Sequence, residues 1–518
     1  MSDTNLPAAG ASESLAALNE RVRYDLECLN LPAKNWVPER SGPDGEKVHD
    51  VVVMGGGMCG LVAAFALISG GVRNLRILDR NPPGYEGPWL TYARMKTLRS
   101  PKTLPGPALG MGCLTFRAWF EAQFGAMEWE RLDKIPRPMW MDYLRWYREV
   151  LDLPVENRIE IERIRPEGAY LRLALRGGDE KSILTRRLVM ATGREGTGGP
   201  RIPEFATALP DHLVAHSSDD LDYGALKGKR VAVVGVGASA VDNAAEALEH
   251  GAREVRILVR RKTMPTINKL MGIGSFGFTH GYRSLDEAWR WAIMHYSYMT
   301  QTPPPRDSTL RVSRHPNAYF HFGAGVQEAR IAGEEIVLTT PRGELRTDFL
   351  ILGTGFHVAP DARPELAGSA DDILLWKHKY TPPRELAHSE LGNFPYLAQD
   401  FSFIERKPGT APWLSRIHCF NYAASLTMGK VSGDIPGISK GATWLAGAIA
   451  ASFYDEDIDA HWQHLRDYDT PELKGDEWRA DPWPDENSRL QGEGVTGCDD
   501  RDRERLARSP TTDRGLKT

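Results

Sequence analysis

One strand–glycine–helix unit occurs twice in this sequence, and the second copy begins 180 positions after the first. The strand-like runs DVVVM (50–54) and RVAVVG (230–235) each lead through a glycine-rich turn into a helix-like stretch. The small residues of the two turns occupy matching positions: Gly55, Gly57 and Gly60 in the first, and Gly235, Gly237 and Ala240 in the second. A buried strand, such a turn and a helix are the parts of a dinucleotide-binding βαβ unit. The duplication therefore predicts an α/β fold with two Rossmann-like dinucleotide-binding domains.

In the first copy, each small residue has a physical task. Gly55 permits a tight turn, Gly57 lets the backbone approach a pyrophosphate at the helix N-terminus, and Gly60 lets helix and strand pack closely. Asp79 ends the next strand-like run, NLRILD, 22 positions after Gly57, where a carboxylate can accept hydrogen bonds from a ribose 2′-OH. We therefore predict an adenine-dinucleotide site without a 2′-phosphate, with Arg80 as a further cofactor-binding candidate. A glycine-rich turn in an unrelated α/β fold is the alternative.

The second copy lacks the acid. The same spacing from Gly237 reaches Val259, and the basic cluster Arg260, Arg261 and Lys262 follows. Loss of the carboxylate removes repulsion against a 2′-phosphate, and guanidinium groups supply charge-assisted hydrogen bonds to it. The second copy is therefore predicted to bind NADPH. A solvated strand end is the alternative interpretation of the basic cluster.

Two further strand-like runs end in glycine, RLVMATG (187–193) between the units and DFLILGTG (348–355) after them. This order resembles the two-dinucleotide-domain flavoproteins, which include the single-component flavin monooxygenases. The resemblance implies that FAD binds the first unit, that the NADPH domain is inserted into the FAD domain, and that the chain returns to the flavin through DFLILGTGF. It also implies flavin contacts at Gly355 and at Gly437, which opens the apolar helix of GDIPGISKGATWLAGAIA (433–450).

The segment after Asp79 resembles this family more specifically. EGPW resembles its G-G-x-W segment, with Trp89 at the Trp position and Pro88 in place of a glycine. KTLRSP (96–101) and PRPMWMDYLRWY (136–147) resemble segments of the amine N-hydroxylating branch, in which a lysine lies near the flavin. The resemblance makes Lys96 and Trp89 the catalytic candidates. A surface lysine is the alternative interpretation of Lys96.

The family resemblance implies a reaction in which NADPH reduces FAD by hydride transfer. Reduced flavin then captures O₂ as a C4a-peroxide, which delivers one oxygen atom to a small-molecule substrate. N- or S-oxygenation is slightly favoured over Baeyer–Villiger oxygenation of a ketone. The remaining alternatives are an NADPH-dependent FAD oxidoreductase without oxygen transfer and a flavin- and nucleotide-binding regulator without turnover.

Two sequence features weigh against the Baeyer–Villiger and disulfide-reductase alternatives. Only His216, in PDHLVAHSSDD, matches the linker motif that precedes the second unit in the family, whereas the Baeyer–Villiger fingerprint requires a Trp there. We interpret His216 as a structural hinge residue. The five cysteines lie far apart and form no C-x-x-C pair, which weighs against a disulfide-reductase centre.

An aromatic segment at 274–311 interrupts the second unit. It could line a substrate channel, form a lid, or be a buried helix that packs on the sheet. Its candidates are Trp289, Trp291, His295, Tyr296 and Tyr298, with Arg306 and Arg311 as less favoured contacts to nicotinamide or a polar substrate. Ser239, in the second glycine turn, is also a cofactor-binding candidate.

These assignments divide the chain. The expected ranges are an N-terminal extension (1–45), the first part of the FAD-binding domain (46–205), the NADPH-binding domain (206–345), the returning part of the FAD-binding domain (346–470) and a polar C-terminal tail (471–518).

The composition and the sequence motifs exclude several classes of binding partner. The net charge of −5 gives no basic character that would point to nucleic acid or an anionic membrane. We find no metal-ligand motif, no signal peptide and no apolar run of the roughly 18 residues that a spanning helix needs. The sequence therefore predicts a cytoplasmic enzyme that acts on a small molecule with O₂, binds no metal, and could form a homo-oligomer.

Overall fold

The computed structural model describes residues 11–479, so residues 480–518 of the predicted tail, with Cys498, lie outside the described residues. The chain divides into two compact units, one up to Ala451 and one from Ser452 onward. The first unit contains every sheet of the described residues and all the predicted site residues. The described part of the second contains the helix α14 (Ile458–Asp467). None of the helices within residues 11–479 combines the length and the apolar character needed to cross a membrane.

The first sheet has the strand order β3-β2-β1-β6-β5-β4, with β17 also paired to β6. Its strands are β1 (Val48–Met54), β2 (Leu75–Asp79), β3 (Val155–Asn157), β4 (Glu160–Glu167), β5 (Tyr170–Arg176), β6 (Ser182–Met190) and β17 (Ile417–Cys419). β1 is parallel to β2 and β6, and the β-branched runs of β1 are buried, as expected for a central parallel strand. The antiparallel strands β4 and β5 extend the sheet beyond β6.

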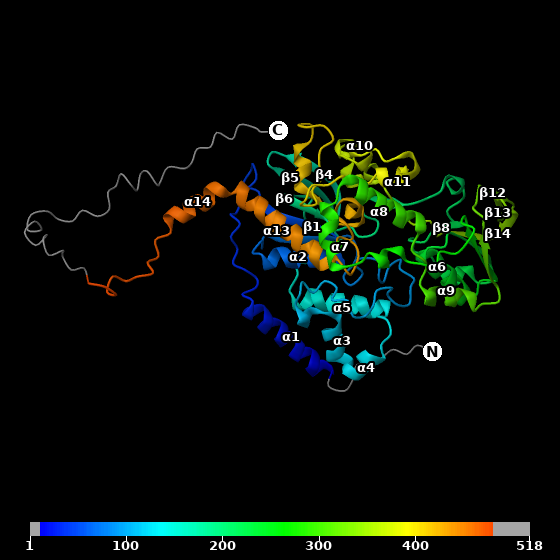
Figure 1. The fold of residues 1–518 in the computed structure, drawn as a ribbon, viewed down its shortest axis with the longest axis horizontal. Helices are drawn as coiled ribbons and strands as arrows, with labels where there is room; N and C mark the ends of the chain where they lie inside the picture. The colour runs from blue at the N-terminus through cyan, green and yellow to red at the C-terminus, as the bar shows by residue number, and fades with distance from the viewer. Residues whose placement is uncertain (1–10, 480–518) are drawn as a thin grey trace, which may run out of the picture. The chain divides into compact units, whose positions relative to one another are not determined.

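Helices accompany the first sheet. They are α1 (Ala11–Cys28), α2 (Met58–Ser69), α3 (Phe116–Phe124), α4 (Ala126–Arg131), α5 (Arg137–Val150) and α13 (Ile438–Glu456). α1, within the predicted N-terminal extension, packs against α3 (Figure 1). The indole Nε1 of Trp146 on α5 donates a hydrogen bond of 2.8 Å to Asn19 on α1. The N-terminal helix is therefore part of the packed unit.

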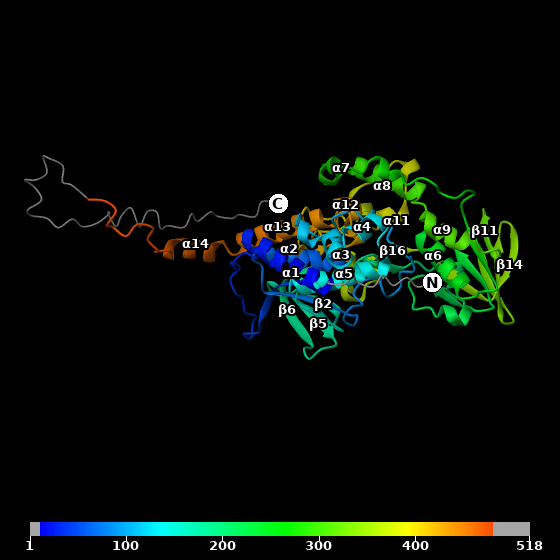
Figure 2. The same ribbon diagram turned by 90° about the horizontal axis from the view of Figure 1, so that it is seen from below.

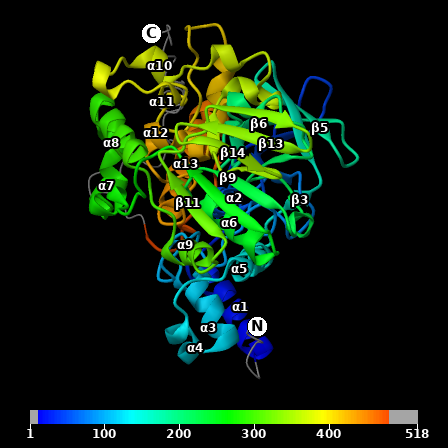
Figure 3. The ribbon, with the colours of Figure 1, turned by 90° about the vertical axis from the view of Figure 1, so that its right-hand side faces the viewer.

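The second sheet is entirely parallel, with the order β11-β10-β9-β15-β8. Its strands are β8 (Val214–His216), β9 (Arg230–Val234), β10 (Glu254–Val259), β11 (Ala318–Phe322) and β15 (Phe349–Leu352). The helices α6 (Ala238–Glu249) and α9 (Arg306–Ser313) pack together beside it (Figure 3). A separate antiparallel sheet follows from β12 (Glu328–Ala332), β13 (Glu335–Thr340) and β14 (Gly343–Thr347).

The position of β15 corrects one expectation. The DFLIL run was expected to belong to the returning FAD-binding part, with a boundary at 345/346. Instead β15 lies between β9 and β8, in the middle of the second sheet. Its preceding residue, Asp348, accepts a 2.7 Å hydrogen bond from the backbone N–H of Arg230. Buried apolar strands of both sheets look alike in sequence, so the pattern indicated the strand but not its partner.

The chain crosses between the sheets twice at one place. β7 (Gly198–Pro200) precedes the second sheet and β16 (Phe356–Val358) follows it, and these strands pair antiparallel with each other. Figure 2 shows β2, β5 and β6 of the first sheet apart from β11 and β14 on the side of the second. The second sheet is thus formed by an internal segment of the chain, joined to the rest through one two-stranded ribbon.

The aromatic segment forms α7 (Phe276–Gly281) and α8 (Glu287–Thr300) before α9. α8 forms hydrogen bonds with the chain that follows the second sheet. The indole Nε1 of Trp291 donates to the carbonyl of Leu386. Arg290 donates to the carbonyl of Thr427, which lies in α12 (Ser425–Met428). The remaining helices are α10 (Trp376–Lys379) and α11 (Ser389–Gly392). The aromatic segment therefore connects the second sheet to the chain that follows it.

Candidate functional site

Both glycine turns face one cavity of about 1990 Å³. A site for a drug-sized ligand has roughly 300–1000 Å³, so this cavity can hold more than one large ligand. Its wall contains predicted residues from both halves of the chain: Gly55, Gly57, Asp79, Arg80, Trp89, Gly235, Gly237, Ser239, Arg260, Arg261, Gly355 and Gly437. Residues that the sequence predicted separately are therefore brought together around one space.

The first turn requires its glycines for measurable reasons. Gly55 has a φ of +108°, and a Cβ there would lie 2.7 Å from the carbonyl oxygen of Ala191. A Cβ at Gly60 would lie 1.8 Å from the carbonyl oxygen of Gly55, so only glycine lets α2 approach β1. A Cβ at Gly57 would meet only Gly87, at 3.5 Å, on the cavity side. The turn is therefore a backbone cradle at the N-terminus of α2, and its shape suits a pyrophosphate.

Asp79 braces this cradle. One carboxylate oxygen accepts a 2.7 Å hydrogen bond from the Gly56 N–H, and the other accepts a 2.8 Å bond from the Asn81 N–H. Burial raises the pKa of Asp79, and these two backbone donors oppose that effect. Each carboxylate oxygen can accept more than one hydrogen bond, so Asp79 keeps acceptor capacity for a ribose hydroxyl. Arg80, beside it in the wall, pairs with Glu195 at 3.1 Å.

Glu86 is a buried acid whose role the sequence did not reveal. It is 4% exposed and accepts hydrogen bonds from Arg148 at 2.9 Å and Asn157 at 2.7 Å. A Cβ at Gly56 would lie 3.3 Å from its side chain, so Glu86 supports the back of the glycine turn. The acid is the first residue of EGPW, and that adjacency was the available signal.

Three other predicted residues, Trp89, Gly355 and Gly437, lie in the cavity wall and come from loops far apart in the sequence. Trp89 packs edge-on against Trp140, with ring centroids 6.2 Å apart. Gly437 is required, because a Cβ there would lie 2.3 Å from the carbonyl oxygen of Lys430. Gly355 has a φ of +77°. The backbone of these loops can therefore approach a ligand closely.

His216, at the end of β8, is buried, and its ring lies 5.6 Å from that of Phe356, the first residue of β16. The N–H of Ser218 donates to its Nδ1, so Nε2 carries the proton and donates 3.0 Å to the carbonyl of Gly355. Burial lowers the pKa of His216, which keeps the ring neutral at neutral pH. The side chain thus links the end of β8 to the exit from the second sheet.

The second turn repeats the geometry of the first. Gly235 has a φ of +110°, and a Cβ there would lie 2.5 Å from the carbonyl oxygen of Gly353. Ala240, at the third small position, is fully buried, and a Cβ on Gly353 would lie only 2.4 Å from the Ala240 Cβ. Ser239 and Gly237 lie in the cavity wall. The second turn therefore accepts a methyl group at its third small position, where the first turn excludes one, and Gly353 provides the room for it.

The three residues of the basic cluster, Arg260, Arg261 and Lys262, lie in different environments. Arg260 is exposed in the cavity wall and forms no ion pair with another residue of the described chain. Arg261 also lies in the wall, but its guanidinium donates to Gln301 Oε1 at 2.9 Å and to the Met299 carbonyl at 2.6 Å. Lys262 is exposed and lies outside the wall. Arg260 is the guanidinium that is free to meet a phosphate.

Lys96 lies outside the cavity wall, although Met95 and Arg99 on either side of it contribute to the wall. Its side chain is 61% exposed, and its Nζ lies 2.9 Å from Glu249 and 3.8 Å from Glu246 on α6. The catalytic role inferred for Lys96 from the family resemblance stays a prediction, and these contacts favour the surface-lysine alternative.

Replacing Lys96 with Met tests the two interpretations. Exposed ion pairs contribute about 0–1 kcal/mol, so we expect a small loss in the free energy of unfolding and less than a twofold change in kcat. The measurements are chemical denaturation and steady-state turnover of the flavin-loaded enzyme. A drop in kcat of about tenfold or more would restore the catalytic assignment.

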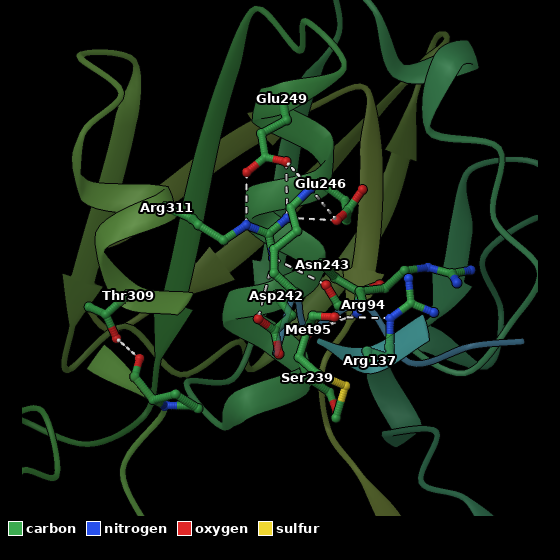
Figure 4. Close-up of polar contacts among 12 residues, drawn as sticks. Arg94, Met95, Arg137, Ser239, Asp242, Asn243, Glu246, Glu249, Thr309 and Arg311 are labelled. Carbon is green, nitrogen blue, oxygen red and sulfur yellow. Dashed lines mark hydrogen bonds and ion pairs between the residues drawn. The ribbon is translucent and has the colours of Figure 1, made fainter. Parts of the chain in front are cut away.

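Arg311 pairs with the same two glutamates on α6 (Figure 4), and it lies outside the cavity wall. Its guanidinium pairs with Glu246 at 2.6 Å and Glu249 at 2.8 Å, and donates to the carbonyl of Arg94 from the first part of the chain. Burial acts to raise the pKa of Glu249, but hydrogen bonds from Arg311 and Lys96 lower it to about 2. Arg306 also lies outside the wall. Neither arginine is therefore placed to contact nicotinamide or substrate. Arg311 forms structural ion pairs instead, and Arg306 does not line the cavity.

Of the aromatic candidates, only Tyr298 lines the cavity. Its hydroxyl accepts a 3.2 Å hydrogen bond from Arg201. Trp291 is buried, whereas Trp289 and Tyr296 are 63% and 55% exposed. The His295 ring lies 5.9 Å from that of His388. The segment therefore contributes one face of α8 to the cavity, together with Phe278, Thr279 and Tyr282 from the turns before it.

Comparison with solved structures identifies the fold. An ornithine hydroxylase from Pseudomonas aeruginosa is 19% identical, with a TM-score of 0.60 over 78% of this chain and 99% of that one. An L-lysine 6-monooxygenase from Pseudomonas syringae is 18% identical, with a TM-score of 0.59 over 79% and 99%. An ornithine N-hydroxylase from Kutzneria sp. 744, described with FADred, NADP+ and L-orn, is 19% identical, with a TM-score of 0.59 over 78% and 99%. The fold is that of the flavoprotein monooxygenases.

Sequence comparison identifies the family. Residues 52–271 match the family model described as pyridine nucleotide-disulphide oxidoreductase. A FAD-dependent urate hydroxylase from Xanthomonas campestris pv. campestris is 40% identical over 468 residues, which cover 89% of this chain and 98% of that protein. The chain therefore belongs to the family of this FAD-dependent hydroxylase, within the flavoprotein monooxygenase superfamily. It is a flavin-dependent monooxygenase, and the resemblance seen in the sequence is confirmed.

Proposed function

We propose that this protein is a FAD- and NADPH-dependent monooxygenase whose substrate is a urate-like, nitrogen-rich heterocycle. The observation that carries the proposal is the shared cavity, into which both glycine turns open. The substrate class rests on the 40% identity with a FAD-dependent urate hydroxylase. The first sheet and its returning segment would form the FAD-binding domain. The second sheet, through Leu352, would form an inserted NADPH-binding domain.

The residues of the first turn fit FAD. Gly57 leaves an open cradle at the N-terminus of α2, and Asp79 retains acceptors for a ribose, while Trp89 and Gly437 border the same space. FAD, when bound, would supply hydride acceptance and the activation of O₂. The second turn fits the pyrophosphate of NADPH, with Arg260 free for the 2′-phosphate.

The chain's own task is to hold both dinucleotides and the substrate in one enclosed space. The wall between the two turns contains apolar and aromatic side chains from both halves, including Phe278, Tyr282 and Met294. Tyr282 is buried, and its hydroxyl donates to the carbonyl of Leu426 at 3.1 Å. This contact attaches the aromatic segment to α12, which precedes the Gly437 turn, and such packing would limit the access of water to the reacting centre.

N- or S-oxygenation of a small molecule is a second candidate, which the fold shared with ornithine and lysine hydroxylases favours. Baeyer–Villiger oxygenation has no further support here. The reductase alternative needs a cysteine pair at the flavin, and within the described residues Cys28, Cys59, Cys113 and Cys419 are free thiols.

The experiment is a substrate panel. Purified protein loaded with FAD is mixed with NADPH and O₂, and urate, amines, sulfides and ketones are tested in turn. We expect urate-like compounds to accelerate NADPH consumption and to give a product with one added oxygen atom. Acceleration by amines alone, with urate inert, would establish the second candidate. Rapid NADPH oxidation without any oxygenated product would establish an oxidoreductase.

A further inference from the structure

The aromatic segment and the loop before it expose an apolar surface. Six of its apolar side chains are at least half exposed, and they form what we term the α7–α8 face: Ile267, Met271, Phe276, Trp289, Tyr296 and Met299. The 3₁₀ turn Lys269–Gly272 contacts α8, so the two stretches that carry these side chains adjoin. Figures 2 and 3 show α7 and α8 together at an outer edge of the first unit.

The exposed side of α8 is held in place by its buried side. On the buried side, the indole of Trp291 donates a 2.8 Å hydrogen bond to the carbonyl of Leu386, and Arg290 donates to the carbonyl of Thr427. Trp289 and Tyr296 are seven positions apart, and residues with this spacing lie on one side of a helix. The two exposed rings therefore form a stripe on an anchored helix, and the surface is ordered before any partner binds.

The α7–α8 face is large enough for a stable interface. Its six side chains expose on the order of 800 Å², given the roughly 150–250 Å² that one aromatic side chain offers. The largest apolar patch on a typical monomer is about 300–600 Å². A standard protein–protein interface buries about 800 Å² on each partner. The face therefore exceeds what a monomer ordinarily leaves in water and matches one side of a stable dimer.

The charges of this region favour a second copy of the chain as the partner. Interface cores contain few charges and many aromatic and Met side chains, and residues 291–305 contain no Asp, Glu, Lys or Arg. Three of the five charged residues within 263–305 are buried or engaged with the chain's own side chains: Arg283, Glu287 and Arg290. The other two, Lys269 and Asp286, are exposed. One cation and one anion provide no net charge to attract an anionic membrane or a strongly charged protein, but they complement each other across a twofold axis.

We propose that the α7–α8 face binds the same face of a second copy, so that the enzyme is a twofold-symmetric dimer. In such an interface the same surface occurs on both sides, and Lys269 of each copy pairs with Asp286 of the other. The segments that carry the face also line the cavity from within, through Met271, Phe278 and Tyr298. The second copy would therefore brace this wall of the cavity from outside.

The test is sedimentation of the FAD-loaded enzyme over a range of protein concentrations, which requires no substrate. The wild type should sediment with the mass of two chains. Trp289→Glu combined with Tyr296→Glu should sediment as a monomer, with a dissociation constant raised about a hundredfold or more, because each copy loses two aromatic anchors. Both side chains are more than half exposed, so the variant should keep the flavin content and the melting temperature of a folded protein.

Met127→Glu is the matched control, because Met127 is 73% exposed but lies on α4, which does not carry the face. This variant should remain a dimer. A wild type that stays monomeric at every concentration, or a double variant that still dimerises, would overturn the proposal. Binding of the wild-type monomer to phosphatidylglycerol vesicles, with loss of that binding in the double variant, would also overturn it, since the face would then be a membrane surface.

Hydrogen exchange of the wild type tests the same surface without a substitution. The backbone amides of α8 and of the turn Lys269–Gly272 should exchange more slowly at concentrations at which the dimer forms. Amides of α4 should exchange at the same rate throughout. A dimer that leaves exchange in α8 and the turn unchanged would use another surface, and the proposal would then be wrong.

Discussion

Gly60→Ala should yield protein that purifies without flavin. A Cβ at this position would lie 1.8 Å from the carbonyl oxygen of Gly55, and that atom belongs to the backbone of the turn and cannot move aside. α2 must then shift away from β1, which opens the pyrophosphate cradle and disturbs the centre of the first sheet. Overpacking of a core costs about 1–3 kcal/mol, and a backbone clash of this size lies at the upper end. Absorbance of the purified protein and its denaturation midpoint measure both effects.

Gly57→Ala is the informative control. The added methyl group would meet only Gly87, at an ordinary contact distance of 3.5 Å, so the fold should be retained. Because the methyl group points into the cavity, FAD binding should still weaken. A Gly60→Ala protein that retains full flavin and wild-type stability would show that the first turn does not hold the cofactor.

Arg260→Ala combined with Arg261→Ala should raise the KM for NADPH about tenfold to a hundredfold and leave the KM for NADH within about twofold. Each charge-assisted hydrogen bond to a phosphate is worth about 1.5–3 kcal/mol, and NADH offers no 2′-phosphate to lose. Arg260 should account for most of the effect, because Arg261 is already bonded to Gln301 and Met299. Initial-rate kinetics with both cofactors measure the ratio.

Lys262→Ala serves as the matched control, since Lys262 belongs to the same basic cluster but lies outside the cavity wall. It should leave the kinetics of both cofactors unchanged. Equal losses for NADPH and NADH in the double variant would refute the phosphate assignment.

The sequence predicted the features that depend on local backbone chemistry. Gly55, Gly60 and Gly235 occupy positions where a side chain would clash with a neighbouring carbonyl, so their spacing reported a real constraint. The strands β1 and β9 and the helices after them followed from the same spacing and from apolar composition. These local patterns were therefore sufficient to predict an α/β fold of parallel sheets.

Features that depend on distant partners could not be predicted in this way. Lys96 is adjacent in sequence to wall residues, but two carboxylates on α6, about 150 positions later, hold it at the surface. Arg261 is equivalent to Arg260 in sequence, yet in the fold Gln301 occupies its guanidinium. The apolar composition of β15 would suit a buried strand in either of the two large sheets. In each case the position of the residue or strand depends on a contact with a distant part of the chain, and a local sequence pattern does not specify such contacts.

The paired strands β7 and β16 have a mechanical consequence. Both covalent connections between the second sheet and the rest of the chain run through this one ribbon. Away from it, the ion pairs of Lys96 with Glu249 and of Lys134 with Asp307 join the two halves, and the buried side chains of Tyr282 and Trp291 donate hydrogen bonds to the carbonyls of Leu426 and Leu386. Electrostatic attraction is screened within about 8–10 Å at physiological salt. Raising the ionic strength should therefore weaken the two ion pairs and leave the ribbon and the buried contacts in place, so we expect the two halves to stay attached in high salt.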